Sequence, residues 1–225
     1  MTITEIQHES KTRFLDAALH VIRARGYSAT RIEDICDAAG LTKGSFFHHF
    51  KGKEDLALAA AQYFSDMAGG LFASAPYHRQ QDPLDRLLGY IDFRKSILLG
   101  ELPEYTCLLG TMVQETYETH PAIGEACDRF IMLHARTVEV LVAQALEKYP
   151  VDGEWTAVSL ALYTQAVIQG SFILAKARHG PQVAADCLDH LHRYIELLFN
   201  QPHKPNPHGG MKNEMHGNRE GQQAE

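Results

Sequence analysis

Helical patterning runs along almost the whole chain, over about residues 10–199, and no segment shows the signals of a strand. Sustained alternating runs rich in Val, Ile and Thr are lacking, and so are the Asn-Gly pairs that close hairpins. Over residues 10–25, Phe14, Ala18 and Ile22 recur at four-residue intervals on one face, as in an amphipathic helix. The sequence therefore predicts an all-α fold.

Further helices are expected at intervals along the chain. Proline suits the first position of a helix and ends one further along, so Pro121 and Pro150 delimit the longest of them. The last helix carries apolar residues at alternating steps of four and three, a stripe that packs on another helix of this chain or of a partner. The expected ranges are 53–73, 83–100, 107–118, 120–149 and 181–199.

The most apolar segment, residues 154–178, has the length of a membrane span and no charge between Trp155 and Ala175. Polar residues interrupt it at several points, so its strictly apolar runs are short. We expect a buried central helix or an oligomer interface here. Together, residues 154–178 and 181–199 are expected to form a homodimer interface.

The length of 225 residues allows one large or two modest domains, and the hydrophobic share of 45% is typical of a folded, soluble chain. The 4 cysteines lie far apart without a C-x-x-C pair, which favours a reducing compartment over a disulfide framework. No signal-peptide pattern is visible, so a cytoplasmic location is expected. Residues 201–225 are poor in apolar residues and are expected to be a disordered tail.

Residues 27–55 carry the signals of two short helices joined by a tight turn. Thr30 and Glu33 are spaced as a capping box, so a helix is expected to begin at Thr30. Gly40 suits the left-handed conformation of an abrupt turn. Thr42 can then cap a second helix that runs from Lys43 to Phe50.

The second of these helices is predicted to bury one face and to present the other to DNA. Phe46 and Phe50 are four residues apart and are expected to point inward, whereas Lys43, Ser45, Phe47 and either His48 or His49 remain outside. Although the net charge is −7, residues 1–55 hold as many basic as acidic residues, and residues 41–53 hold three lysines and no acid. Local charge therefore permits binding in a major groove, where a helix-turn-helix reads bases with the start of its second helix.

The N-terminal part of the sequence is similar to a known family. The run from about Lys11 to Phe64, roughly a quarter of the chain, resembles the N-terminal domain of the tetracycline-repressor (TetR) family. The matching features are Gly26-Tyr27, Ala29-Thr30-Arg31-Ile32, Ala38-Ala39-Gly40-Leu41, Lys43-Gly44-Ser45, His49-Phe50-Lys51 and Lys53-Glu54-Asp55-Leu56.

The resemblance implies a three-helix DNA-binding domain over 1–53 and a helical ligand-binding and dimerisation domain over 54–200. It also implies a homodimeric repressor on a palindromic operator of double-stranded DNA, released when a small-molecule effector enters the larger domain. The DNA-binding residues that it implies are Thr30, Arg31, Thr42, Lys43, Gly44, Ser45, Phe47, His48, His49 and Lys53, with Thr30 and Lys53 on phosphates. The family usually has two tyrosines where this chain has Phe47 and His48, which leaves the roles of those two positions open.

The identity of the effector cannot be predicted from the sequence. Aromatic and Met residues at helical spacing, and polar residues inside apolar helices, are candidates for the pocket, although each can also be an ordinary core or solvated residue. These candidates are Phe64, Met67, Phe93, Met112, Glu115, His134, Tyr163 and Gln165. No cofactor and no metal site are predicted.

Three alternatives stay open. Cys107 follows a break in the helical pattern and is predicted to open a helix, whose positive end lowers a thiol pKa, so a redox or electrophile sensor is one of them. A helical enzyme or small-molecule carrier is another, although the catalytic motifs sought are lacking and no enzymatic activity is expected. Activation instead of repression is the third.

Overall fold

The computed structural model describes residues 3–200, and the side chains of residues 8–200. Within this range all the regular structure is helical, which confirms the predicted all-α fold. The predicted disordered tail, residues 201–225, lies outside the described residues. The helices are α1 Ile3–Arg25, α2 Ile32–Ala39, α3 Lys43–His49, α4 Lys53–Ala73, α5 Pro83–Ser96, α6 Leu102–Tyr105, α7 Leu108–Thr116, α8 Pro121–Lys148, α9 Ala157–Arg178 and α10 Gln182–Phe199, with a 3-10 turn over Pro76–Arg79.

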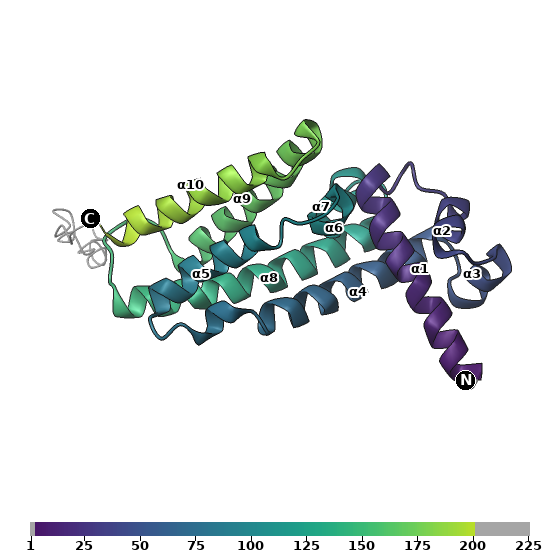
Figure 1. The fold of residues 1–225 in the computed structure, drawn as a ribbon, viewed down its shortest axis with the longest axis horizontal. Coiled ribbons are helices and arrows are strands. Elements are labelled where there is room, and N and C mark those ends of the chain that lie inside the picture. Colours follow the sequence, from purple (N-terminus) through teal and green to yellow (C-terminus); the bar gives the residue numbers. More distant parts are fainter. Residues whose placement is uncertain (1–2, 201–225) are drawn as a thin grey trace, which may run out of the picture.

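The helices form an elongated body with a small unit at one end (Figure 1). Helices α4, α5, α8, α9 and α10 run lengthwise through the body, and α8 lies against α4, α5, α7 and α9. Helix α1 crosses the end of the body, and α2 and α3 lie beyond it (Figure 1). We call α1–α3 the N-terminal unit and α4–α10 the helical body.

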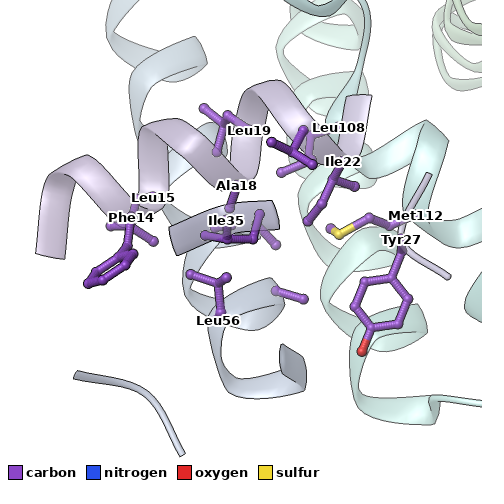
Figure 2. Close-up of a cluster of buried hydrophobic side chains, with 14 of the residues drawn as sticks. Phe14, Leu15, Ala18, Leu19, Ile22, Tyr27, Ile35, Leu56, Leu108 and Met112 are labelled. Atoms are coloured by element: carbon purple, nitrogen blue, oxygen red, sulfur yellow. The ribbon is translucent and has the colours of Figure 1, made fainter. Parts of the chain in front are cut away.

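Two clusters of buried apolar side chains hold these parts together. One lies in the helical body, between α5, α8, α9 and α10. The other fills the N-terminal unit, where Phe14, Ile22 and Ile35 are almost fully buried. Figure 2 shows that this second cluster also takes in Leu108 and Met112, which belong to α7 of the body. The N-terminal unit is therefore packed onto the body by a shared core.

The segment after α5 departs from the sequence prediction. A helix was expected over 83–100, whereas α5 ends at Ser96. Gly100 then adopts a left-handed φ of 77°, and the short helix α6 begins directly after it. The side chain of Glu104 accepts a hydrogen bond from the backbone N–H of Glu101 at 2.6 Å, which holds the start of α6. This break brings α6 and α7 against α1.

Helix α9 is long and apolar enough to cross a membrane, judged by length and composition alone. In the fold it packs against α8 and α10. Its buried polar groups are satisfied inside the protein, because Thr164 donates to the carbonyl of Leu160 at 2.8 Å and Ser171 to that of Ile168 at 2.7 Å. One face of α9 is therefore buried in the protein, whereas apolar residues such as Leu162 and Ile173 are exposed on the helix, so the two roles predicted for residues 154–178, a core helix and an oligomer interface, both stay open.

Candidate nucleic-acid interface and ligand cavity

Helix α2 begins one residue later than the sequence predicts. Its N-cap is Arg31, and the backbone N–H of Arg31 donates to the Asp34 carboxylate at 2.9 Å. The predicted capping box of Thr30 and Glu33 is therefore wrong. Thr30 is buried instead, and its hydroxyl donates to the carbonyl of Gly26 at 2.6 Å. Because that bond fixes Thr30 inside the loop after α1, the helix starts beyond it.

The turn between α2 and α3 has the predicted geometry. Gly40 lies in the left-handed region with φ 62°, and its N–H bonds the carbonyl of Asp37 at 3.1 Å. Thr42 caps α3, since its side chain accepts from the N–H of Ser45 at 3.2 Å. Both predictions are confirmed, and together they fix the angle at which α3 leaves α2.

Aromatic packing holds α3 on the rest of the unit. Phe46 is fully buried and meets Phe14 of α1 edge-to-face, with ring centroids 5.6 Å apart. Phe50, which follows α3, is also buried and lies 6.2 Å from the same ring. Both residues point inward as predicted, so the opposite face of α3 is turned to solvent.

The solvent face of α3 carries the residues predicted for the groove. Thr42, Lys43, Gly44, Phe47 and His48 are exposed, and Ser45 is half-buried. The ammonium of Lys43 forms an ion pair with the Glu33 carboxylate of α2, with 56% of the Lys43 side chain exposed. Phe47 is 56% exposed, which is unusual for so large an apolar side chain.

His49 differs from its neighbour His48. It is half-buried, its Nε2 lies 2.7 Å from the Ser10 hydroxyl, and its ring meets Phe14 edge-to-face. Burial also lowers the pKa of His49 below its ordinary value. Of the two histidines, His48 therefore takes the outward position, and His49 ties α3 to α1.

Three other predicted DNA-binding residues are engaged in the loop between α1 and α2. The Lys53 ammonium donates to the carbonyls of Tyr27 and Thr30, both at 3.0 Å, and lies 4.3 Å from the Tyr27 ring centre. Thr30 is buried, as described above, and Arg31 is exposed and pairs with Asp34 at 3.3 Å. Lys53 and Thr30 therefore shape the loop, and their contacts with phosphate stay predictions.

A cavity of about 480 Å³ lies in the helical body between α4, α5, α6, α7, α8 and α9, and Arg23 of α1 also lines it. Four of the predicted ligand residues line it: Phe64, Met67, His134 and Gln165. Arg94, Phe72, Tyr105 and Phe172 line it too and were not among the predicted residues. An arginine inside an amphipathic helix looks the same in sequence whether it faces a cavity or solvent.

The structure places the other four predicted ligand residues elsewhere. Phe93 packs against Phe72 and Tyr77 behind the cavity wall. Met112 is fully buried in the cluster shared with the N-terminal unit. Tyr163 is exposed and meets Tyr194 of α10, with ring centroids 5.3 Å apart. Glu115 is exposed, lines a second and smaller cavity between α7 and α9, and accepts from the N–H of Ser28 at 2.7 Å. Helical spacing gives the face of a residue but does not show what packs on that face.

A chain of polar groups crosses one side of the cavity. The Gln165 amide donates to the Tyr90 hydroxyl at 3.5 Å, and that hydroxyl lies 2.9 Å from Nε2 of His134. Burial lowers the pKa of His134 to about 3, so its ring is neutral at physiological pH. The three side chains therefore offer hydrogen bonds without charge.

A smaller cavity of about 220 Å³ lies between α7 and α9 and shares Cys107 with the larger one. Cys107 is the N-cap of α7, as predicted, and its Sγ accepts from the N–H of Gly110 at 3.4 Å. Lys176 lines the same cavity and donates to the hydroxyl of Thr111 at 2.8 Å. Burial lowers the pKa of Lys176.

Comparisons with known proteins agree with this geometry. The sequence profile described as "Bacterial regulatory proteins, tetR family" matches residues 14–60. The transcriptional regulator AcuR of Cereibacter sphaeroides is 29% identical over 110 residues, which is 49% of this chain and 49% of AcuR. The HTH-type transcriptional repressor KstR2 of Rhodococcus jostii is 46% identical over 46 residues, which is 20% of this chain and 22% of KstR2.

A solved structure matches nearly the whole fold. The TetR transcriptional regulator from Chloroflexus aurantiacus has a TM-score of 0.74 and 27% identity, over 85% of this chain and 96% of that one. By contrast, the match covers at most about half the length of the first curated relatives. The family profile spans the N-terminal unit and the start of α4, whereas the structural likeness extends over the helical body.

Proposed function

We propose that this chain, which belongs to the TetR family of bacterial regulatory proteins, is a cytoplasmic DNA-binding transcriptional repressor, released from a palindromic operator by a small molecule. The observation that carries the proposal is the solvent face of α3. Lys43, Phe47 and His48 are exposed there, and α3 holds no acidic residue. An enzyme or carrier gains nothing from that surface, whereas binding in a DNA groove requires one.

The start of α3 is suited to base edges and phosphates. A helix-turn-helix places the first residues of its second helix in the major groove. Lys43 is at that end, and an exposed ion pair such as Lys43 with Glu33 is weak enough to be exchanged for guanine acceptors or phosphate. Gly44, which follows, has no side chain to keep the backbone away from the DNA.

A second copy of the chain is the proposed partner for α9 and α10. Val158, Leu162 and Ile173 of α9 are between 41% and 50% exposed, and Leu197 of α10 is 56% exposed. Midway along α9, a side chain at Gly170 would meet no atom within 4 Å. Exposed apolar residues on both sides of a glycine, which has no side chain, let another helix approach closely, as in a dimer interface.

Contacts from the body hold the loop that leads into α2. Arg23 of α1 donates to the carbonyls of Glu104 and Thr106, at 3.3 and 3.2 Å. Glu115 of α7 accepts from Ser28 in the loop itself. Since Arg23, Glu104 and Thr106 also line the larger cavity, a ligand there would act on the support of the N-terminal unit. Release follows if the ligand binds better to a state in which that support has moved.

Selection of bound sequences from random double-stranded DNA tests the proposal directly. We expect a palindrome whose half-sites lie about one helical turn or more apart, and loss of selection by Lys43→Ala with Phe47→Ala. A metabolite panel added to the selected DNA complex then tests release. Failure to recover any enriched sequence contradicts DNA recognition, and an enriched site without symmetry contradicts the dimer.

The dimer can also be tested without DNA. Leu162→Glu places a charge within the exposed apolar stripe of α9 and should convert the protein to a monomer in sedimentation velocity. Val140→Glu is the matched control, because Val140 is 53% exposed on α8, outside the proposed interface. Equal behaviour of the two variants would argue against this interface.

A thiol sensor is the second candidate function, and Cys107 is the observation that favours it. Its side chain borders both cavities and lies at the N-terminal end of α7, whose other end carries Glu115 and its bond to Ser28. Mass spectrometry after treatment with iodoacetamide, alongside DNA binding by Cys107→Ser, tests it. Loss of DNA binding while Cys107 stays unmodified would exclude the role.

A further inference from the structure

Arg94, on the wall of the larger cavity, has no polar partner among the described residues. Arg94 of α5 lies over the rings of Phe72 and Phe172, with its guanidinium carbon 5.1 and 5.7 Å from their centres. Among residues 8–200, no carboxylate lies within ion-pair distance of Arg94 and no hydrogen bond engages it. The two aromatic rings hold the guanidinium in place by cation–π contact and leave its N–H donors available.

The other charged residues of the wall are already engaged. Arg23 donates to three backbone carbonyls, those of Leu19, Glu104 and Thr106. The Glu104 carboxylate accepts from the N–H of Glu101. Among the described residues of this wall, Arg94 is therefore the cation whose N–H donors are all unengaged, and a ligand with one negative charge would match it.

The rest of the wall is suited to an apolar body. Phe64, Leu109, Phe130 and Ile131 line it from α4, α7 and α8. The side chains of Met67, Leu71 and Leu133 also line the cavity but are 45% to 52% exposed, so the cavity opens to solvent between α4 and α8. A volume of about 480 Å³ is within the range of small-molecule sites.

We propose that the cavity binds an apolar monocarboxylate, with the carboxylate on Arg94 and the hydrocarbon or aromatic body along the apolar wall. A planar guanidinium pairs with a planar carboxylate through two parallel hydrogen bonds, and the apolar surroundings strengthen that pair. The neutral Gln165 and His134 line the cavity and can bond a polar substituent of the ligand without opposing its charge, while the Tyr90 hydroxyl is buried behind them and joins the two. As the effector of DNA release, this ligand class rests on the proposed function; as a ligand of the cavity, it does not.

Matched acids and amides test the charge requirement. Octanoate with octanamide, and 3-phenylpropanoate with 3-phenylpropanamide, are titrated calorimetrically into the protein without DNA. We expect each acid to bind about tenfold or more tightly than its amide, the ratio that corresponds to a charged hydrogen bond. Arg94→Met should remove this preference and leave the amides within about threefold, because methionine keeps the apolar contacts with Phe72 and Phe172.

Two further variants keep the test decisive. Arg94→Lys retains the charge and should keep part of the preference for the acid, which a merely structural role of Arg94 would not predict. Lys95→Met removes a neighbouring cation of α5 that pairs with Asp189 outside the cavity, at 2.6 Å, and should leave the preference unchanged. Equal binding of acids and amides, or an acid preference that survives in Arg94→Met, would overturn the proposal.

The operator complex separates this inference from the proposed function. Acids that bind through Arg94 but leave the DNA complex intact would confirm the ligand class and contradict ligand release. A neutral compound that releases the DNA, in a protein whose cavity does not prefer acids, would support release and overturn the carboxylate assignment.

Discussion

The solvent face of α3 and the wall of the larger cavity both carry cations, but they hold them in opposite ways. Lys43 on α3 is 56% exposed and pairs with Glu33, itself 48% exposed. Arg94 on the wall is half-buried, lies between two aromatic rings and has no acidic partner among the described residues. An exposed pair can exchange its partner for a phosphate at little cost in free energy. A cation on an apolar wall gains more interaction free energy from a single anion whose shape matches the site.

The difference fits the two kinds of ligand that we propose for this chain. DNA presents a regular array of phosphates, so a surface of exchangeable pairs adapts to it. A small molecule must match the positions of groups that packing has already fixed. Between the two surfaces lie the shared apolar core, which includes Leu108 and Met112, and the polar contacts of Arg23, Glu115 and Lys53.

Substitutions on the two sides of α3 test whether its buried side serves stability and its solvent face serves DNA binding. Phe46→Ala removes a fully buried ring that meets Phe14 and Phe50, so we expect a loss of about 3–5 kcal/mol in the free energy of unfolding. Phe47→Ala, one residue on, should change stability by less than about 0.5 kcal/mol and weaken DNA binding instead. Urea titration followed by circular dichroism, with DNA binding measured in parallel, distinguishes the two. A stability loss of the same size in both variants would show that the solvent face of α3 is also structural.

Arg23→Met tests the link between the two surfaces. It deprives the carbonyls of Glu104 and Thr106 of a buried donor, so we expect a loss of about 2–3 kcal/mol and earlier unfolding of the N-terminal unit. Arg25→Met is the control on the same helix, because Arg25 is 62% exposed and reaches Asp34 only at 3.5 Å. Hydrogen exchange of α2 and α3 should rise in Arg23→Met and stay unchanged in Arg25→Met. Equal protection of those helices in both variants would contradict a supporting role for Arg23.

The α2–α3 region was predictable from sequence because its determinants are local. A glycine in the left-handed region, a threonine cap and two phenylalanines four apart are all read within eleven residues of one another. The error of one residue at the start of α2 also has a physical cause. The Thr30 hydroxyl can either accept from the N–H of Glu33, as in a capping box, or donate to a carbonyl earlier in the chain. In the structure it donates to the carbonyl of Gly26.

The cavity could be predicted only in part because its wall comes from seven helices, α1 and α4 to α9. His134 and Met112 were chosen on the same kind of reasoning, yet one lines the cavity and the other is buried in a different cluster. Arg94 could not be predicted from local sequence. Its distinguishing feature is that the described residues packed around it, which lie far away in sequence, supply no acidic partner. Periodicity gives the face of a helix, and only packing decides what that face meets.

Lys43→Ala tests whether Lys43 leaves its ion pair with Glu33 to contact DNA. If Lys43 reads a base, operator binding should weaken by about 1–3 kcal/mol and specificity at one position should relax. If it contacts phosphate alone, binding should fall evenly across sequences, with a salt slope smaller by about one. Glu33→Gln is the complementary variant, since it frees Lys43 from its partner and should tighten DNA binding modestly. A titration in which neither variant changes affinity or salt slope would remove Lys43 from the interface.

Asp82 tests whether an ion pair of the helical body, with a half-buried carboxylate, is held more tightly than the exposed pair of Lys43 with Glu33. Hydrogen bonds from Lys148 at 2.6 Å and Tyr149 at 2.5 Å lower the pKa of Asp82 far below its ordinary value. A depressed carboxyl pKa stabilises the fold above the unfolded value of about 3.9, and that contribution is lost as the pH falls below it. Asp82→Asn keeps a cap for α5 but has no charge to lose, so the drop in Tm from pH 7 to pH 3 should shrink. Asp85→Asn, in the first turn of the same helix, is the control, and an equal reduction there would show that Asp82 is no more tightly held than other surface carboxylates.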